Sequence, residues 1–161
     1  NAKAYGAKAI HVRGFGEAHT HWSIGAMPDL ARLTAAEMSS RTAFEMAGVS
    51  HEAIDLVECY DSFTITVLMT LEALGFCKPG EGGAFVSGQR TAPGGAFPLN
   101  TNGGGLSYCH PGMYGIFLLV EAVRQLRGEA GERQVDNVRT ALVHGTGGTL
   151  SSGGTVILAN H

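Results

Sequence analysis

The hydrophobic pattern of the chain predicts four short strands. Apolar and polar residues alternate in the first, and the second is a short apolar run interrupted by Asp55 and Glu58. The predicted strands cover residues 8–15, 54–60, 139–144 and 155–159. Between them, three longer stretches carry apolar residues at helical spacing. The predicted helices cover residues 34–47, 61–74 and 111–127. This alternation of strands and helices predicts one α/β domain, built on a mixed sheet, over residues 1–161.

Residues at the predicted helix ends support these boundaries. Thr34 and Glu37 have capping-box spacing, with Thr34 as the N-cap of the first helix, and Gly48 suits its C-terminal end. Pro111 occupies the favoured first position of the last helix, so we expect His110 directly before that helix.

Composition indicates a globular protein and excludes several classes. Hydrophobic residues make up 44% and charged residues 16% of the 161 residues, and the formal net charge is −3. Without a basic cluster or an apolar run of about 20 residues, we expect no nucleic-acid partner and no membrane span. The three cysteines form no CxxC pair and no signal peptide is visible, so we expect reduced thiols and a cytoplasmic location. His19 and His21 lack a third ligand, so we expect no metal.

Glycine is unusually frequent, with 24 residues, many of them gathered in clusters that suit tight turns or close approach to a ligand.

The chain begins at Asn1 without an initiator methionine, which suggests a fragment or a processed product. Residues 77–95 form a predicted long loop, and loops of that length are usually functional or part of an interface.

The first candidate site is Tyr60-Asp61-Ser62-Phe63, where a predicted strand ends and a predicted helix begins. Ligands of α/β proteins commonly bind at the carboxyl ends of strands. The structural alternative is that Asp61 or Ser62 caps the helix and Tyr60 is only a strand-end aromatic residue.

The second candidate lies in residues 102–115. At a helix N-terminus, the dipole disfavours an imidazolium, so His110 is expected to stay neutral and to accept a proton or donate to an oxyanion. Gly104 and Gly105 allow close backbone approach to a substrate. Further candidate groups lie beside His110: Tyr108, Cys109 and Tyr114. The alternatives are a capping histidine for His110 and an inert thiol for Cys109, although a helix N-terminus would lower its pKa.

The third candidate is the glycine-rich segment 144–154. It has no GKS or GKT and a strand follows it, so it is neither a phosphate loop nor a dinucleotide fingerprint. We expect it to bind substrate as an oxyanion-type loop. The candidate residues are His144, Gly145, Gly147 and Gly148. The alternative is a flexible hairpin connection.

Taken in order, the three segments resemble the thiolase superfamily. Residues 60–63 look like the position of its Asn-Glu-Ala-Phe or His-Asp-Cys-Phe motif, His110-Pro111 like its Gly-His-Pro motif, and residues 144–154 like its last catalytic loop. The resemblance implies an α/β fold that is the C-terminal half of the five-layer thiolase fold, with a mixed five-stranded sheet packed with helices. The nucleophilic cysteine would then belong to the N-terminal half.

Departures from the family motifs bear on the chemistry. Tyr60 replaces the usual Asn or His, Ser62 stands where some members carry an acid/base cysteine, Cys109 replaces a glycine, and the last loop has no cysteine. The chain is therefore most similar to the sterol-carrier and lipid-transfer-protein branch, which includes retro-aldolases. That resemblance implies proton transfer by Tyr60 with Tyr114 or Tyr108, and an enolate site at His110, with Asp61 and Cys109 as further catalytic candidates.

The resemblance implies an enzyme that forms or cleaves carbon–carbon bonds in acyl-CoA thioesters, a thiolase-like acyltransferase. The alternatives are a retro-aldolase acting on β-hydroxyacyl-CoA and a non-catalytic acyl-CoA- or lipid-binding domain. CoA would enter as part of the substrate, with no tightly bound cofactor. The implied partners are the chain's own N-terminal half, a second copy in a homodimer, and a small zinc-ribbon/OB-fold protein. Residues 1–161 alone are expected to be inactive.

Overall fold

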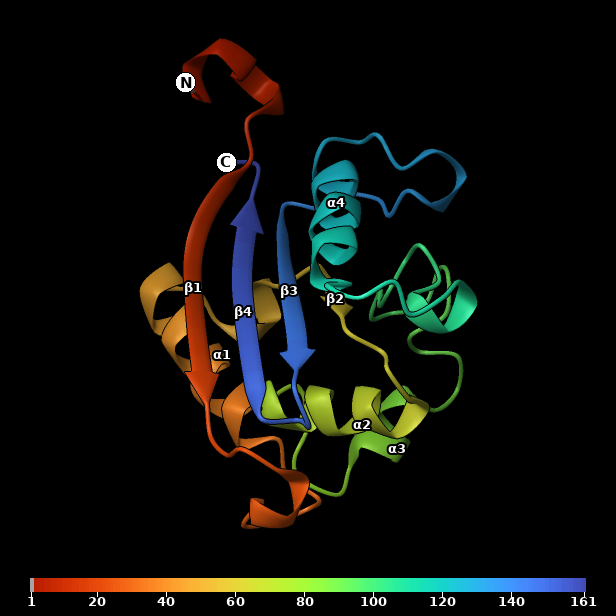
Figure 1. Cartoon of the computed structure of the whole chain (residues 1–161). Coiled ribbons are helices and arrows are strands. Elements are labelled where there is room, and N and C mark those ends of the chain that lie inside the picture. The colour runs from red at the N-terminus through yellow and green to blue at the C-terminus, as the bar shows by residue number, and fades with distance from the viewer. Residues whose placement is uncertain (1) are drawn as a thin grey trace.

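A computed structural model describes residues 2–161, whose core is a four-stranded mixed sheet (Figure 1). The strand order is β1-β4-β3-β2. The strands are β1 (His11–His19), β2 (Leu56–Cys59), β3 (Thr140–Gly147) and β4 (Ser152–Ala159). β4 pairs antiparallel with both β1 and β3, whereas β2 pairs parallel with β3.

The prediction of a fifth strand is wrong, because the segment beside β2 makes only one bridge, between Val57 and Leu99. The Val57 N–H donates to the Pro98 carbonyl at 3.1 Å, and the Asn100 N–H donates to the Val57 carbonyl at 3.0 Å. Pro98 has no N–H to continue the ladder on one side. Asn100 has a φ of 47°, which turns the chain away on the other side.

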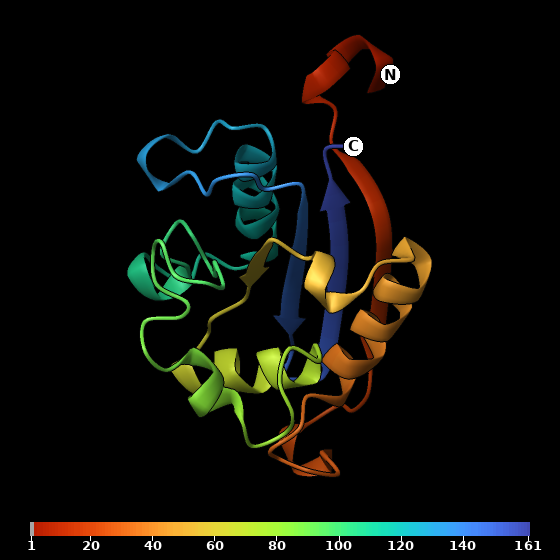
Figure 2. The same ribbon diagram turned by 180° about the vertical axis from the view of Figure 1, so that it is seen from behind.

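Helices cover both faces of the sheet (Figures 1 and 2). The α-helices are α1 (Thr34–Ala47), α2 (Thr64–Ala73), α3 (Gly82–Val86) and α4 (Gly115–Leu126). Short 3₁₀ segments cover Ala2–Lys8, Ile24–Ala26, His51–Ala53, Gly105–Ser107 and Gly131–Arg133. Successive β3 residues separate the two layers: Leu142 packs in the cluster that contains α1, and Val143 packs in the cluster that contains α4. None of these helices is long and apolar enough to cross a membrane in the described part of the chain.

Helix α1 lies unusually close to strand β1, and two glycines permit this contact. A Cβ atom built on Gly14 would lie 2.2 Å from the Ala43 carbonyl oxygen, and one on Gly16 would lie 2.2 Å from the Ser39 carbonyl oxygen. These are backbone atoms that cannot move aside cheaply. Part of the high glycine content therefore serves helix–sheet packing rather than ligand binding.

The predicted start of the first helix needs correction. Thr34 is the first helical residue, and Leu33 occupies the N-cap position without a side-chain cap. Glu37 pairs with the Arg32 guanidinium at 2.7 Å instead of closing a capping box. The predicted end is confirmed, because Gly48 takes a left-handed conformation with a φ of 64°.

The last helix also starts later than predicted. α4 begins at Gly115 rather than at residue 111, because Gly112 and Met113 have φ values of 74° and 47° that interrupt the helical turn. His110 and Pro111 therefore lie in a loop before the helix. The predicted place of His110 directly before the helix is accordingly wrong.

The predicted glycine loop at residues 145–154 is mostly a β-hairpin. β3 and β4 remain paired as far as Gly147 and Ser152, which leaves residues 148–151 as the turn. Residues 77–95 likewise contain a short helix, α3. β1 begins at His11 and continues to His19, beyond the predicted end of the first strand.

Candidate active site

Three distant segments line one hollow of about 450 Å³ at the carboxyl ends of β2 and β3. Tyr60 follows β2 directly. The loop before α4 and the start of that helix contribute a second group, His110, Met113, Tyr114 and Gly115. The end of β3 and its turn contribute Thr146, Gly147 and Gly148. The sheet thus brings together residues that are up to 88 positions apart in the sequence (from 60 to 148).

Aromatic and imidazole rings lie next to one another in this hollow. The Tyr60 ring centroid lies 6.1 Å from that of His110, with the two planes nearly perpendicular, and 5.8 Å from that of Tyr114. The Tyr60 N–H donates to the His144 carbonyl at 2.9 Å, which extends the pairing of β2 with β3 by one residue. The hollow therefore presents groups suited to proton transfer and to hydrogen-bonding an oxyanion.

Asp61 holds the loop that carries His110. Its carboxylate is buried and accepts hydrogen bonds from the Gly105 N–H at 2.7 Å and the Leu106 N–H at 3.0 Å. Helix α2 instead begins at Thr64 with Phe63 at the N-cap position, so the alternative that Asp61 caps this helix is wrong. The contacts of Asp61 are those of a positioning residue rather than of a group facing the hollow.

Gly104 and Gly105 belong to the same anchored loop. The Gly104 N–H donates to the Asn102 side-chain oxygen at 2.9 Å, and the Gly105 N–H is used by Asp61. These two amide groups therefore donate within the protein. A Cβ on Gly104 would overlap the Asp61 carboxylate at 2.2 Å, so the close approach is to a side chain of the protein itself.

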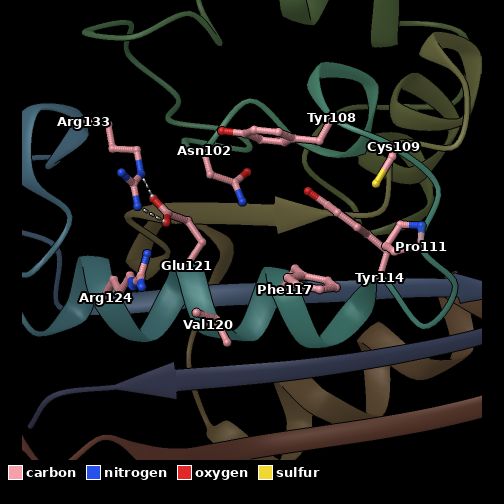
Figure 3. Close-up of a pocket in the computed structure, with 10 residues that line it drawn as sticks. All are labelled: Asn102, Tyr108, Cys109, Pro111, Tyr114, Phe117, Val120, Glu121, Arg124 and Arg133. Carbon is pink, nitrogen blue, oxygen red and sulfur yellow. Dashed lines mark hydrogen bonds and ion pairs between the residues drawn. The ribbon is translucent and has the colours of Figure 1, made fainter.

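Tyr114 lines both the hollow and a neighbouring pocket of about 460 Å³, and Figure 3 shows that neighbouring pocket. The Tyr114 ring is buried, and among the described residues its hydroxyl has no hydrogen-bond partner. Burial, followed by the negative charge of Asp61, raises the pKa of this phenol. Tyr114 is thus held as a neutral phenol between the two cavities.

Tyr108 and Cys109 line this neighbouring pocket and not the hollow that contains Tyr60 and His110. Both residues are exposed. Deeper in the pocket the Arg133 guanidinium donates two hydrogen bonds of 2.9 Å to the Glu121 carboxylate (Figure 3). The structure therefore divides the predicted catalytic residues between two adjoining cavities that share Tyr114.

His144 lies beneath the hollow with a fully buried side chain. Its Nδ1 lies 2.9 Å from the Thr155 hydroxyl, and its Nε2 lies 3.3 Å from the Thr146 hydroxyl. Burial lowers the pKa of this imidazole to about 4. His144 and Gly145 do not line the hollow: the His144 ring contacts other side chains, and Gly145 pairs with Gly154 in the hairpin.

The sequence analysis missed Thr146 and Met113, both of which line the hollow. Thr146 follows His144 by two residues, so the alternation of a strand could have indicated that they share a face. Met113 owes its place to the left-handed turn before α4, for which its sequence carried no signal.

The three cysteines lie outside the hollow. Cys59 is fully buried in β2, and burial raises the pKa of its thiol. Cys77 follows α2, and burial and the charge of Glu72 raise its pKa. Among the described residues no group of three or more His, Cys, Asp or Glu side chains is placed to hold a metal ion.

Comparison with known proteins gives consistent matches. Residues 16–160 match the family described as "Thiolase C-terminal domain-like". The chain is 37% identical over 155 residues to acetyl-CoA acetyltransferase of Methanothermobacter thermautotrophicus, covering 96% of this chain and 40% of that protein. It is 40% identical over 110 residues to sterol carrier protein 2 of Rattus norvegicus, covering 68% of this chain and 20% of that protein.

A solved structure described as "Ltp2-ChsH2(DUF35) aldolase" superposes with a TM-score of 0.81 at 28% identity. The match covers 93% of this chain and 39% of that one. The chain thus spans at most about two fifths of the length of these similar proteins.

Proposed function

This chain belongs to the thiolase C-terminal domain-like family, and from that premise we propose that it supplies half of an active site for carbon–carbon bond cleavage or formation in CoA thioesters. Within that class we propose retro-aldol cleavage of a β-hydroxyacyl-CoA and its reversal. The observation that carries this choice is the hollow itself, where the Tyr60 phenol and the His110 imidazole meet while the chain's thiols lie elsewhere.

The proposed step uses these two side chains. Tyr60, entering the step as the phenolate, accepts the proton of the substrate's C3 hydroxyl. The C2–C3 bond breaks, and the electron pair of that bond forms the enolate of the shortened thioester. The oxygen–hydrogen electron pair becomes the π bond of the released ketone or aldehyde. An N–H of His110 donates to the enolate oxygen, and the proton taken by Tyr60 returns to C2. Atoms and charge balance without an oxidant or a metal.

Thiolase-type acyl transfer is the second candidate, favoured by the 37% identity to an acetyl-CoA acetyltransferase. It requires a nucleophilic cysteine and a second acid/base thiol. The nucleophile would come from a preceding half of the protein. In this chain Cys109 is the exposed thiol beside His110, but it lines the neighbouring pocket.

We further propose that the N-terminal half of the same protein covers the apolar surface beside the hollow. Several exposed apolar residues lie on α4, directly before it, and on β1. Figure 1 shows α4 on one face of the sheet. The residues are Met113, Ile116, Phe117, Val120, Val12 and Phe15. The greater length of the similar proteins supports this assignment.

The remaining partners belong to the same proposal. Acyl-CoA is the substrate and brings CoA with it, a second copy completes a homodimer in the cytoplasm, and a zinc-ribbon/OB-fold protein assists. The similar aldolase is described with a DUF35 component, which supports a partner protein. On this account residues 1–161 alone turn over no substrate.

The test is Tyr60→Phe in the full-length protein, assayed with a 3-hydroxyacyl-CoA. We expect a loss of at least about 100-fold in kcat, the usual contribution of a general base. Tyr5→Phe is the matched control, because Tyr5 is exposed in the first 3₁₀ segment, away from the hollow. Substituting Tyr108 and Tyr114 by Phe in turn decides which of them assists Tyr60. A Tyr60→Phe protein with the wild-type rate would exclude the proposed base.

A further inference from the structure

The neighbouring pocket of about 460 Å³ combines an apolar wall with a charged end (Figure 3). The rings of Tyr114 and Phe117 stack along α4 with their centroids 5.7 Å apart, and Val120 continues this wall one helical turn further on. Arg124 follows after another turn and also lines the pocket. A ligand that is apolar along its length and charged at its tip would match this order of side chains.

The charged end of the pocket is positive overall. Two arginines and one glutamate line the pocket, and the Arg133 guanidinium pairs with the Glu121 carboxylate at 2.9 Å. Within the described residues the exposed Arg124 forms no ion pair. The charge of Glu121 is thus balanced by Arg133. Arg124 is left to hold an anion, and a guanidinium can bind a carboxylate through two parallel N–H groups.

The pocket adjoins the hollow at Tyr114, which lines both cavities. The Tyr60 ring centroid lies 5.8 Å from that of Tyr114 on the side of the hollow. In the other direction, α4 rises about 15 Å along its axis between residues 114 and 124. A substrate with its C3 hydroxyl at Tyr60 therefore needs a long acyl chain to bring a terminal group to Arg124.

We infer that the neighbouring pocket binds the acyl chain beyond C3, and that this chain ends in a carboxylate held by Arg124. The inference rests on the proposed function, because the assignment of Tyr60 fixes where C3 lies. The substrate class is then a long-chain β-hydroxyacyl-CoA with a terminal carboxylate, and retro-aldol cleavage releases the chain in the pocket as a carboxy-aldehyde. Phe117 and Val120 also belong to the surface assigned to the N-terminal half, which would close the outer side of the pocket around the chain.

The test compares two ligands in the full-length protein carrying Tyr60→Phe, so that they bind without reacting. 3-Hydroxydodecanedioyl-CoA and 3-hydroxydodecanoyl-CoA have equal chain length and the same CoA, and differ only in the terminal carboxylate. We expect the dicarboxylic thioester to bind about tenfold more tightly. Arg124→Gln should remove this preference. Arg124→Lys should keep part of it, because lysine retains the charge but not the paired donors.

Arg41→Gln is the matched control, because Arg41 is exposed on α1, which packs on the other face of the sheet. It should leave the preference unchanged. Absence of a preference in the protein with Arg124 intact, or a preference that survives Arg124→Gln, would overturn the inference. Equal weakening of both ligands by Arg124→Gln would assign the guanidinium to a CoA phosphate and would also overturn it. Failure of the proposed function would show separately, as absence of turnover of both thioesters by the wild-type protein, while the binding preference remains measurable.

Discussion

The contact between Asp61 and the loop of His110 gives the sharpest test of how the site is built. The Asp61 carboxylate accepts from two successive backbone amides, at 2.7 Å and 3.0 Å. Asp61→Asn keeps one acceptor oxygen but turns an NH₂ group toward the other amide. One of the two hydrogen bonds is then lost and its donor is left facing another donor.

A hydrogen bond to a charged group contributes about 1.5–3 kcal/mol. Losing one of the two should therefore reduce the local opening free energy of residues 103–110 by about 2 kcal/mol, which raises their amide exchange roughly 30-fold. Hydrogen exchange followed by mass spectrometry on the full-length protein measures this directly. The same variant should lose turnover, because the loop ends at His110, one of the two groups assigned to the reaction.

The control is Asp136→Asn, since Asp136 is exposed and lies outside this loop. It should leave exchange of residues 103–110 at the wild-type rate. If Asp61→Asn also leaves that exchange unchanged, the carboxylate does not hold the loop, and the proposed placement of His110 loses its physical basis.

Two further substitutions test the interior. Burial is the main cause that raises the pKa of Glu58 from 4.5 to about 7. Between these two pH values the folded protein keeps the Glu58 proton, whereas the unfolded chain releases it. The free energy of unfolding therefore falls as the pH rises through this interval. Glu58→Gln should remove that fall, on the order of 3 kcal/mol between about pH 5 and pH 8 in denaturant titrations; an unchanged pH profile would show that Glu58 titrates normally. Gly16→Ala should lower the free energy of unfolding by about 2–4 kcal/mol, because its Cβ would overlap a carbonyl of α1. Gly154→Ala, whose Cβ would meet nothing within 4 Å, should lower it by less than about 1 kcal/mol. Equal losses of stability in thermal melts of the two variants would refute the packing argument.

The layered α/β fold could be predicted because its signals are local. Short apolar segments and helical spacing located all four strands and the helices α1, α2 and α4, and Gly48 marked one helix end correctly. The boundaries that failed depend on local backbone conformation that the patterns do not encode. Thr34 is the first helical residue of α1, with Leu33 at the N-cap position, and α4 began late because two residues before it take left-handed conformations.

The site was predictable in part through the family resemblance, which grouped Tyr60 with residues 144–154. The structure places Tyr60 beside the end of β3 because the ends of neighbouring parallel strands meet at one edge of the sheet. The direction in which each side chain points could not be predicted. His144 and Gly145 lie in a paired strand, and Gly104 and Gly105 spend their amides on the protein, outcomes set by tertiary hydrogen bonds that spacing does not encode.

The role of the glycines could be predicted only in part from the sequence. The glycine clusters were predicted to suit tight turns or close approach to a ligand, yet Gly104, within one cluster, admits the Asp61 carboxylate. Gly14 and Gly16, outside the clusters, admit helix α1. Only Gly147 and Gly148 of the predicted substrate-binding glycines line the hollow. At Gly14, Gly16 and Gly104 another part of the chain lies close to the backbone, and that part belongs to the protein rather than to a ligand.

The most direct test of the proposed chemistry is the dependence of cleavage on free CoA. The full-length protein is mixed with a 3-hydroxyacyl-CoA, and the shortened acyl-CoA and the released carbonyl compound are quantified by mass spectrometry with and without added CoA. Retro-aldol cleavage predicts equal amounts of the two products at a rate that free CoA does not increase. Cleavage that consumes free CoA stoichiometrically, or that occurs only with a 3-oxoacyl-CoA, would contradict the assignment of Tyr60 and His110 to aldol chemistry.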